Sequence, residues 1–180
     1  TSPSTSPEHG FIDPETGEDC TCGEGSQMDL SIIRELFETC LDAAAVLGID
    51  TAKDAVLATL AAQLPRLRPP RILPDGRLAE FGCGLPDKDP HHRHVSHLYG
   101  VYPAAEFTSL RNPECFHAAW RSLNVRGDLS TGWAMGWRAL LRARFLEGER
   151  AERILHHLLT LVSPGPGDYH GGGVYRNLFD

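Results

Sequence analysis

Hydrophobic side chains recur at three- and four-residue spacing in several segments, and this period predicts amphipathic helices. The clearest segment is 28–47, whose apolar face is formed by Met28, Ile32, Ile33, Leu36, Phe37, Cys40, Leu41 and Ala44. Gly48 is expected to end this helix. A second helix is predicted to begin at Thr51, as its N-cap, and to end at Pro65. The two helices would form an αα-hairpin.

The second half of the chain repeats this pattern. Asn112-Pro113 is a favourable start for a helix that ends near Arg126, and a further helix is predicted from Trp133 to Gly148. Residues 149–161 have the apolar spacing of its partner helix. A shorter helix is expected from about His94 to Tyr102, because Pro103 would end it.

The remaining segments are predicted to be loops. Residues 1–27, 65–92 and 163–173 are rich in proline, glycine or charged side chains, and only 77–81 suggests a short strand or an extended loop. Long loops in a compact helical domain usually carry function. The pattern predicts an all-α fold of helical hairpins with long loops. Hairpins stacked in a ring, as in an α/α toroid, would bury their apolar faces against one another, and a plain helical bundle is the alternative.

Composition narrows the function classes. The 180 residues correspond to one domain, and the net charge of −7 argues against a nucleic-acid partner, which requires clustered Lys and Arg. No apolar run approaches the roughly 20 residues of a membrane span. The five cysteines fit neither a disulfide framework nor a paired zinc knuckle. Cys20 and Cys22 lie in a polar loop, where they could bind a metal, cross-link or serve as ordinary small side chains.

Histidine is concentrated in residues 91–97, which contain four of the nine histidines together with Arg93. Three interpretations are open. His92, His94 and His97 could bind a metal ion, Arg93 and the imidazoles could bind the hydroxyls of a polar ligand, or the histidines could be solvated at a helix start. The metal interpretation is the weakest, because no HExxH pattern or nearby acidic partner accompanies them.

Two further candidates lie outside this segment. Glu8 stands between Pro7 and His9-Gly10, and the stiffness of this sequence could hold its carboxyl group in place, as a general acid requires. It could equally be one solvated Glu among 24 acidic residues. Trp133 and Trp137 are spaced by four residues, so they share a helical face that could pack in the core or form an aromatic wall against a sugar ring.

Four motifs occur in a fixed order along the chain: 3–8 (PSTSPE), 92–103 (HRHVSHLYGVYP), 126–134 (RGDLSTGWA) and 177–180 (NLFD). Together they resemble the catalytic domain of glycoside hydrolase family 95, the inverting α-L-fucosidases. The resemblance covers nearly the whole chain.

The resemblance implies that residues 1–180 are part of a catalytic (α/α)6 barrel, without its upstream helices and without the segment that carries the base. It places the general acid at Glu8 and the contacts to the fucose hydroxyls at Arg93 and His94. Trp133 or Phe81 could form a wall against the sugar. The base, an Asp working with upstream Asn residues, is expected beyond Asp180, and Asp128 is read as a loop or cap residue.

The implied activity is the removal of terminal α-L-fucose, most often 1,2-linked, from fucosylated oligosaccharides. No metal or organic cofactor is expected, and the family implies a secreted or periplasmic protein. The 180 residues alone are expected to be inactive. Two alternatives stay open, an α-L-galactosidase of the same family and a non-catalytic helical carbohydrate-binding domain. The second alternative predicts that Glu8 is exposed and far from His94.

Overall fold

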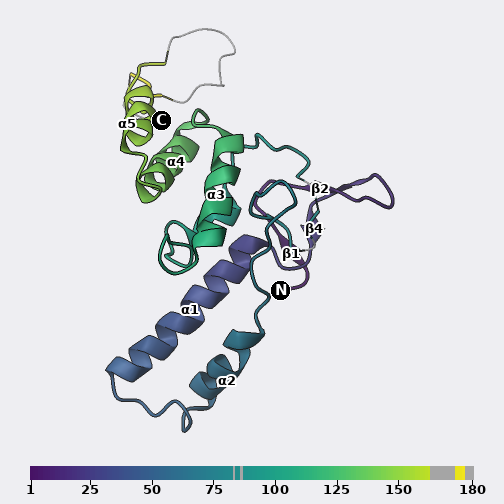
Figure 1. Ribbon diagram of the computed structural model, residues 1–180, viewed down its shortest axis with the longest axis vertical. Helices are drawn as coiled ribbons and strands as arrows, with labels where there is room; N and C mark the ends of the chain where they lie inside the picture. Colours follow the sequence, from purple (N-terminus) through teal and green to yellow (C-terminus); the bar gives the residue numbers. More distant parts are fainter. Residues whose placement is uncertain (83, 86, 163–172, 177–180) are drawn as a thin grey trace.

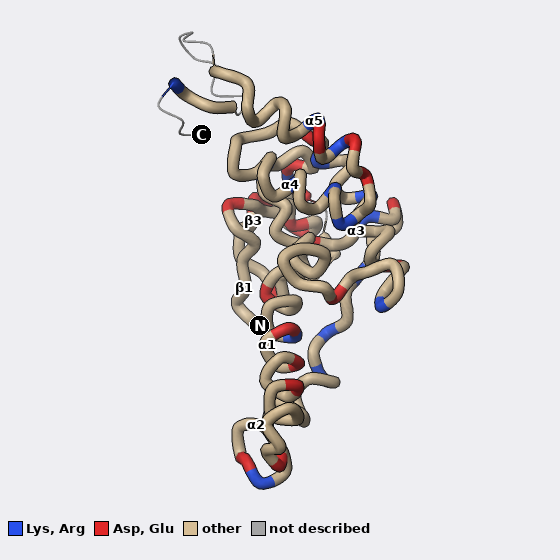
Figure 2. The backbone as a smooth tube through the Cα atoms, turned by 90° about the vertical axis from the view of Figure 1, so that its left-hand side faces the viewer, with Lys and Arg blue, Asp and Glu red and all other residues tan. Residues whose placement is uncertain are grey.

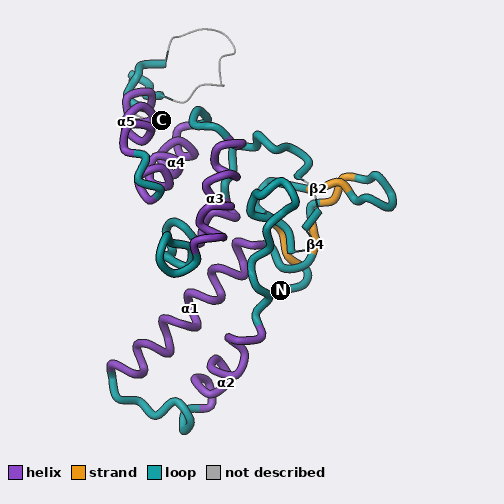
Figure 3. Tube along the Cα trace, in the orientation of Figure 1, coloured by secondary structure: helices purple, strands orange, loops and turns teal. Residues whose placement is uncertain are grey.

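Helices and long loops make up the chain in the computed structural model, which describes residues 1–82, 84–85, 87–162 and 173–176. Within these ranges there are five α-helices: α1 Gln27–Val46, α2 Ala55–Gln63, α3 Pro113–Arg126, α4 Gly132–Arg144 and α5 Gly148–Leu158. Two short 3₁₀ helices, η1 Leu64–Arg66 and η2 Ser96–Gly100, accompany them. The loops account for much of the path between these elements (Figure 3). None of the described helices combines the length and apolar character needed to cross a membrane. The all-α prediction is confirmed.

α1 and α2 form the predicted hairpin, which projects away from the rest of the chain in two perpendicular views (Figures 1 and 2). The N-cap of α1 is Ser26, whose hydroxyl accepts the amide of Asp29 at 3.3 Å. Apolar side chains such as Leu36, Val46 and Val56 remain exposed on the hairpin, and α2 has no buried residue. The hairpin therefore offers apolar surface that the described residues leave uncovered.

The predicted cap of α2 is wrong. Thr51 lies in the preceding turn, and the helix begins after Asp54. Asp54 Oδ1 accepts the amides of Val56 at 2.9 Å and Leu57 at 3.0 Å, so one carboxylate satisfies two of the free amides at the start of the helix.

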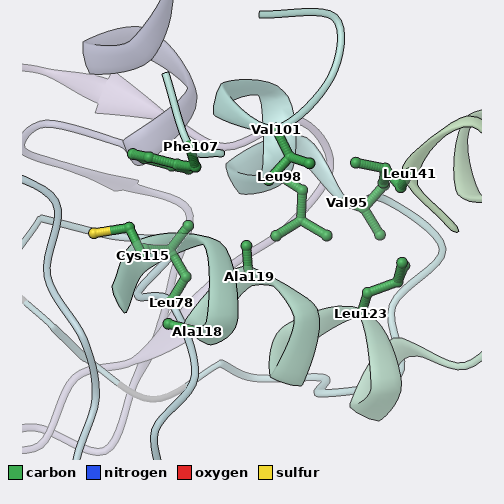
Figure 4. Close-up of a cluster of buried hydrophobic side chains, with 10 residues drawn as sticks. All are labelled: Leu78, Val95, Leu98, Val101, Phe107, Cys115, Ala118, Ala119, Leu123 and Leu141. Carbon is green, nitrogen blue, oxygen red and sulfur yellow. The ribbon is translucent and has the colours of Figure 1, made fainter. Parts of the chain in front are cut away.

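The main hydrophobic core lies where η2 and the loop at Leu78 pack against α3, with Leu141 of α4 at its edge (Figure 4). Its buried members are Leu78, Val95, Leu98, Val101, Phe107, Cys115, Ala118, Ala119, Leu123 and Leu141. A second, smaller cluster joins α4 to α5 through Met135, Ala139 and Ile154. The core thus fixes the histidine-rich segment against α3, since Val95 and Leu98 are part of it.

Two predictions for the irregular segments are wrong in detail. The helix expected from His94 to Tyr102 is only the 3₁₀ helix Ser96–Gly100. Residues 1–27, predicted as loop, contain four two-residue strands: β1 Ser4–Thr5, β2 Phe11–Ile12, β3 Asp19–Cys20 and β4 Cys22–Gly23. β1 pairs antiparallel with β4 (Ser4 opposite Gly23), and β2 pairs antiparallel with β3 (Phe11 opposite Cys20). These ladders fix the segment that carries Glu8.

Several sequence features fall outside or at the edge of these elements. The 163–173 loop, apart from Gly173, and the 177–180 motif lie outside the described residues, as does Cys83. Cys20, Cys22, Cys40 and Cys115 are all free thiols, so Cys20 and Cys22 are not cross-linked to each other.

Candidate active site

Glu8 stands at the corner of a tight turn. The amide of His9 donates to the carbonyl oxygen of Ser6 at 3.1 Å, with Pro7 at the second position of the turn. Glu8, at the third position, has φ +51°, a left-handed conformation that side chains other than glycine rarely adopt and that a type II turn requires. Its side chain is 61% exposed. The turn therefore presents the carboxylate outward from a fixed backbone.

The histidine-rich segment meets this carboxylate. The guanidinium of Arg93 donates to Glu8 Oε2, and His94 Nε2 lies 3.3 Å from the same oxygen. Burial lowers the pKa of His94, against the opposing effect of the Glu8 carboxylate. The ring therefore favours the neutral form at neutral pH and can both donate and accept a hydrogen bond. Three predicted site residues thus come together, although 85 positions separate Glu8 from Arg93 in the chain.

The two tryptophans of α4 have different environments. Trp133 is 49% exposed, and the edge-on contact between its ring and that of His94 has a centroid separation of 4.7 Å and an interplanar angle of 71°. Trp137, one turn later, packs against the main core and donates from Nε1 to the carbonyl of Tyr102 at 2.9 Å. Of these two tryptophans, only Trp133 contacts one of the three predicted site residues, namely His94.

Phe81, the other predicted wall residue, is enclosed. It is 1% exposed, and its ring packs edge-on against Phe11 with a centroid separation of 4.9 Å. The Phe81 ring also stacks on that of His9, with a centroid separation of 6.0 Å. Phe81 is therefore part of the packed interior and has no exposed surface that could contact a sugar beside Glu8.

The three histidines of the metal interpretation do not converge on one point. His92 and His94 lie side by side, with ring centroids 5.1 Å apart, whereas His97 is buried and its Nδ1 lies 3.3 Å from Glu80 Oε2. Within the part of the chain that the structure describes, the one group with metal-site spacing is His9, Glu80 and Asp87.

That group does not fit a metal ion, because the positively charged guanidinium of Arg126 already lies between its carboxylates. The guanidinium nitrogen Nη2 of Arg126 lies 2.6 Å from Glu80 Oε2 and 3.7 Å from Asp87 Oδ2. A divalent ion between the two carboxylates would be repelled by this fixed positive charge at close range. The arrangement is a buried ion-pair network.

Glu80 is the centre of this network and was missed by the sequence analysis. It is 1% exposed, and burial raises its pKa to about 7, although Arg126 and the Ser6 hydroxyl favour its charged form. Ser6 Oγ donates to Oε1 at 2.5 Å. The signal that could have found it is a single acid inside the apolar sequence 78–81, since a charge in such a place requires a partner.

Arg138 of α4 is a second group that the sequence analysis missed. It is 1% exposed, and burial lowers its pKa to about 10, so it remains charged at neutral pH. Nη2 donates to the carbonyls of His92 at 3.3 Å and Arg93 at 3.2 Å, and Nη1 donates to that of Leu129 at 2.9 Å. One buried guanidinium thus holds the backbone from which Arg93 extends.

Asp128 has a structural role in the loop before α4. Its carboxylate accepts hydrogen bonds from Arg142 Nε at 2.9 Å and Arg150 Nε at 2.9 Å. These contacts agree with its interpretation as a loop residue, and they commit both of its oxygens.

The buried histidine beneath the site predicts a pH effect on stability. Burial and Arg126 lower the pKa of His9 from 6.5 to about 4, so between these values the unfolded chain binds a proton that the folded chain does not. At about 1.4 kcal/mol per pKa unit, His9 makes the folded state less stable by about 3 kcal/mol as the pH falls through this range. The stability advantage of the wild type over His9→Asn should therefore shrink by about this amount between pH 7 and 4.

Urea unfolding of both proteins at a series of pH values measures this difference. His156→Asn is the control, because the side chain of His156 is 78% exposed. That variant should follow the wild type at every pH. A constant difference between wild type and His9→Asn would contradict the prediction.

The comparisons with known proteins agree on one family. The sequence matches the glycosyl hydrolase family 95 catalytic domain over residues 1–180. It is 37% identical over 179 residues to Alpha-L-fucosidase 2 of Arabidopsis thaliana, which covers 99% of this chain and 21% of that protein. It is also 32% identical over 146 residues to Probable alpha-fucosidase A of Aspergillus niger, covering 76% of this chain and 17% of that protein. A protein of the same name from Aspergillus oryzae is 30% identical over 193 residues, covering 98% of this chain and 25% of that protein. The chain thus spans about a fifth of the length of these curated relatives.

Proposed function

The chain belongs to glycosyl hydrolase family 95, and we propose from this that it forms the acid-bearing half of an active site that removes terminal α-L-fucose from glycans. The observation that carries the proposal is the meeting of exposed Glu8 and Arg93 with the largely buried ring of His94. The non-catalytic alternative required Glu8 to be exposed and far from His94. Glu8 is exposed, but its carboxylate is in contact with both residues, which favours the catalytic proposal.

Glu8 is the proposed general acid. Inverting hydrolysis needs one protonated carboxyl group at the leaving oxygen and a base across the ring, about 6.5–9.5 Å away, with room for a water molecule. The turn at Ser6–His9 holds Glu8 in a fixed position from which it can reach a bound glycoside. In the structure the Glu8 carboxyl group is paired with Arg93, so the two groups must separate when the sugar enters.

Arg93 and His94 are the proposed sugar contacts. Once the sugar has displaced the Glu8 carboxyl group from Arg93, the Arg93 guanidinium can donate several hydrogen bonds to the sugar hydroxyls. His94, held in its neutral form, can donate to one hydroxyl or accept from another. Trp133 lies against His94 and is the proposed apolar wall for the C6 methyl group, which a deoxy sugar presents in place of a hydroxyl.

The base and the rest of the barrel are proposed to come from sequence outside these 180 residues. From the family resemblance we expect the base on a segment after residues 177–180, and Asp128 is already held by Arg142 and Arg150. The exposed apolar side chains of α1 and α2 support an (α/α)6 barrel in which further helices cover this hairpin.

The experiment that tests the proposed function is hydrolysis of 2'-fucosyllactose by the full-length protein, followed by NMR. We expect release of L-fucose, first as the β anomer, because inversion replaces the α bond from the opposite face. Release of the α anomer would contradict the inverting mechanism. Faster hydrolysis of the matching α-L-galactoside would identify the L-galactosidase alternative, and binding without turnover would identify the non-catalytic one.

A further inference from the structure

We infer that Glu80 is a positioning residue for Glu8, because its one buried carboxylate contacts both ends of the turn that carries Glu8. This inference rests on the proposed function. It adds to that function a residue that touches neither the substrate nor the reacting atoms.

The first end of the turn is Ser6. Its hydroxyl donates to Glu80 Oε1 at 2.5 Å, and both residues are at most 2% exposed. A hydroxyl bound to a buried carboxylate is held strongly, because no water is available to replace either partner. Ser6 therefore cannot shift without leaving a buried acceptor unpaired.

The second end of the turn is His9, which is 4% exposed. Its Nε2 lies 3.5 Å from Glu80 Oε2, and its amide closes the turn on the Ser6 carbonyl. The ring also stacks on that of Phe81 and makes a tilted contact with that of His92, at centroid separations of 6.0 and 4.7 Å. Only Pro7 and Glu8 lie between these two anchored residues, so the left-handed backbone at Glu8 is fixed on both sides.

Arg126 connects Glu80 to the segment that carries Arg93 and His94. Its Nη2 donates to Glu80 Oε2 at 2.6 Å, and its Nη1 donates to the Asp89 carbonyl at 2.7 Å. Asp89 begins the turn that leads to Arg93, since its side chain accepts the His91 amide at 2.9 Å. The Glu80–Arg126 pair thus sets the position of Glu8 relative to Arg93 and His94.

The loss of rate on removing the contacts between Glu80 and the Glu8 turn should depend on the leaving group. A small displacement of a catalytic group can cost about 10²-fold in rate, but only if the reaction needs that group. A lactose leaving group needs a proton from the general acid. Fluoride leaves as an anion and needs little protonation, so hydrolysis of α-L-fucosyl fluoride should tolerate a displaced Glu8.

The decisive variant is Ser6→Ala in the full-length protein. We expect kcat on 2'-fucosyllactose to fall roughly 10- to 100-fold, with KM within about threefold of wild type, and kcat on α-L-fucosyl fluoride within about threefold. The matched control is Ser4→Ala. Ser4 is also buried, and it donates to Asp29 Oδ2 at 2.6 Å and accepts the Ser26 amide at 2.9 Å, but it lies outside the turn. It should leave the ratio of the two rates unchanged.

Glu80→Gln should show the same dependence on the leaving group, because the amide can still accept from Ser6 but no longer matches the charge of Arg126. If this variant does not fold, Ser6→Ala still decides the question.

Equal loss on both substrates, or no loss on either, from Ser6→Ala would overturn the inference. If Glu8→Gln itself shows no leaving-group dependence, the proposed function fails. If Glu8→Gln shows it and Ser6→Ala does not, only the role of Glu80 fails.

Discussion

Glu8→Gln is expected to lower kcat on 2'-fucosyllactose by roughly 10²- to 10⁴-fold, the range typical for loss of a general acid. The amide has nearly the same shape and can still accept a hydrogen bond from Arg93, but it has no acidic proton to give to the leaving oxygen. Substrate binding should change little. On α-L-fucosyl fluoride, whose leaving group needs little protonation, the variant should stay within about tenfold of the wild type.

Initial rates on the two substrates measure this effect. Glu15→Gln is the matched control, because it makes the same chemical change at an exposed position in the same N-terminal segment. It should behave like the wild type on both substrates. Near-normal turnover of 2'-fucosyllactose by Glu8→Gln would remove Glu8 from the mechanism.

Arg93→Met is expected to lower kcat/KM on 2'-fucosyllactose by about 10- to 100-fold, mainly through a higher KM. Hydrogen bonds from a charged donor contribute about 1.5–3 kcal/mol, and methionine keeps the length of the side chain without its donors. Arg93→Lys should recover only part of the loss, because an ammonium group cannot reproduce the planar set of donors.

Steady-state kinetics of the variants, with titration of L-fucose as an inhibitor, test this prediction. L-fucose should bind Arg93→Met more weakly by a factor similar to the change in KM. Arg153→Met is the control, since Arg153 is exposed on α5. An unchanged KM and an unchanged inhibition constant in Arg93→Met would show that Arg93 does not contact the sugar.

Most helices could be predicted because their causes are local. The 3.6-residue period placed α1 within one residue of its observed ends, and Asn112-Pro113 located the start of α3. The predicted start of α2 was wrong because two nearby side chains could each serve as the N-cap. Thr51 and Asp54 both suit a helix N-cap, and only the observed path of the chain brings the Asp54 carboxylate to the free amides.

The sequence by itself determined the helices and, through the order of its motifs, the family and the candidates Glu8, Arg93 and His94. The tertiary structure decided which candidates share a surface. It separated Trp133 from Trp137, enclosed Phe81, and placed Glu80 beneath the Glu8 turn. Helix period and capping arise from neighbours within a few residues and are therefore visible in the sequence. The burial of a carboxylate and the identity of its partner depend on segments dozens of residues apart, and only the folded chain brings those segments together.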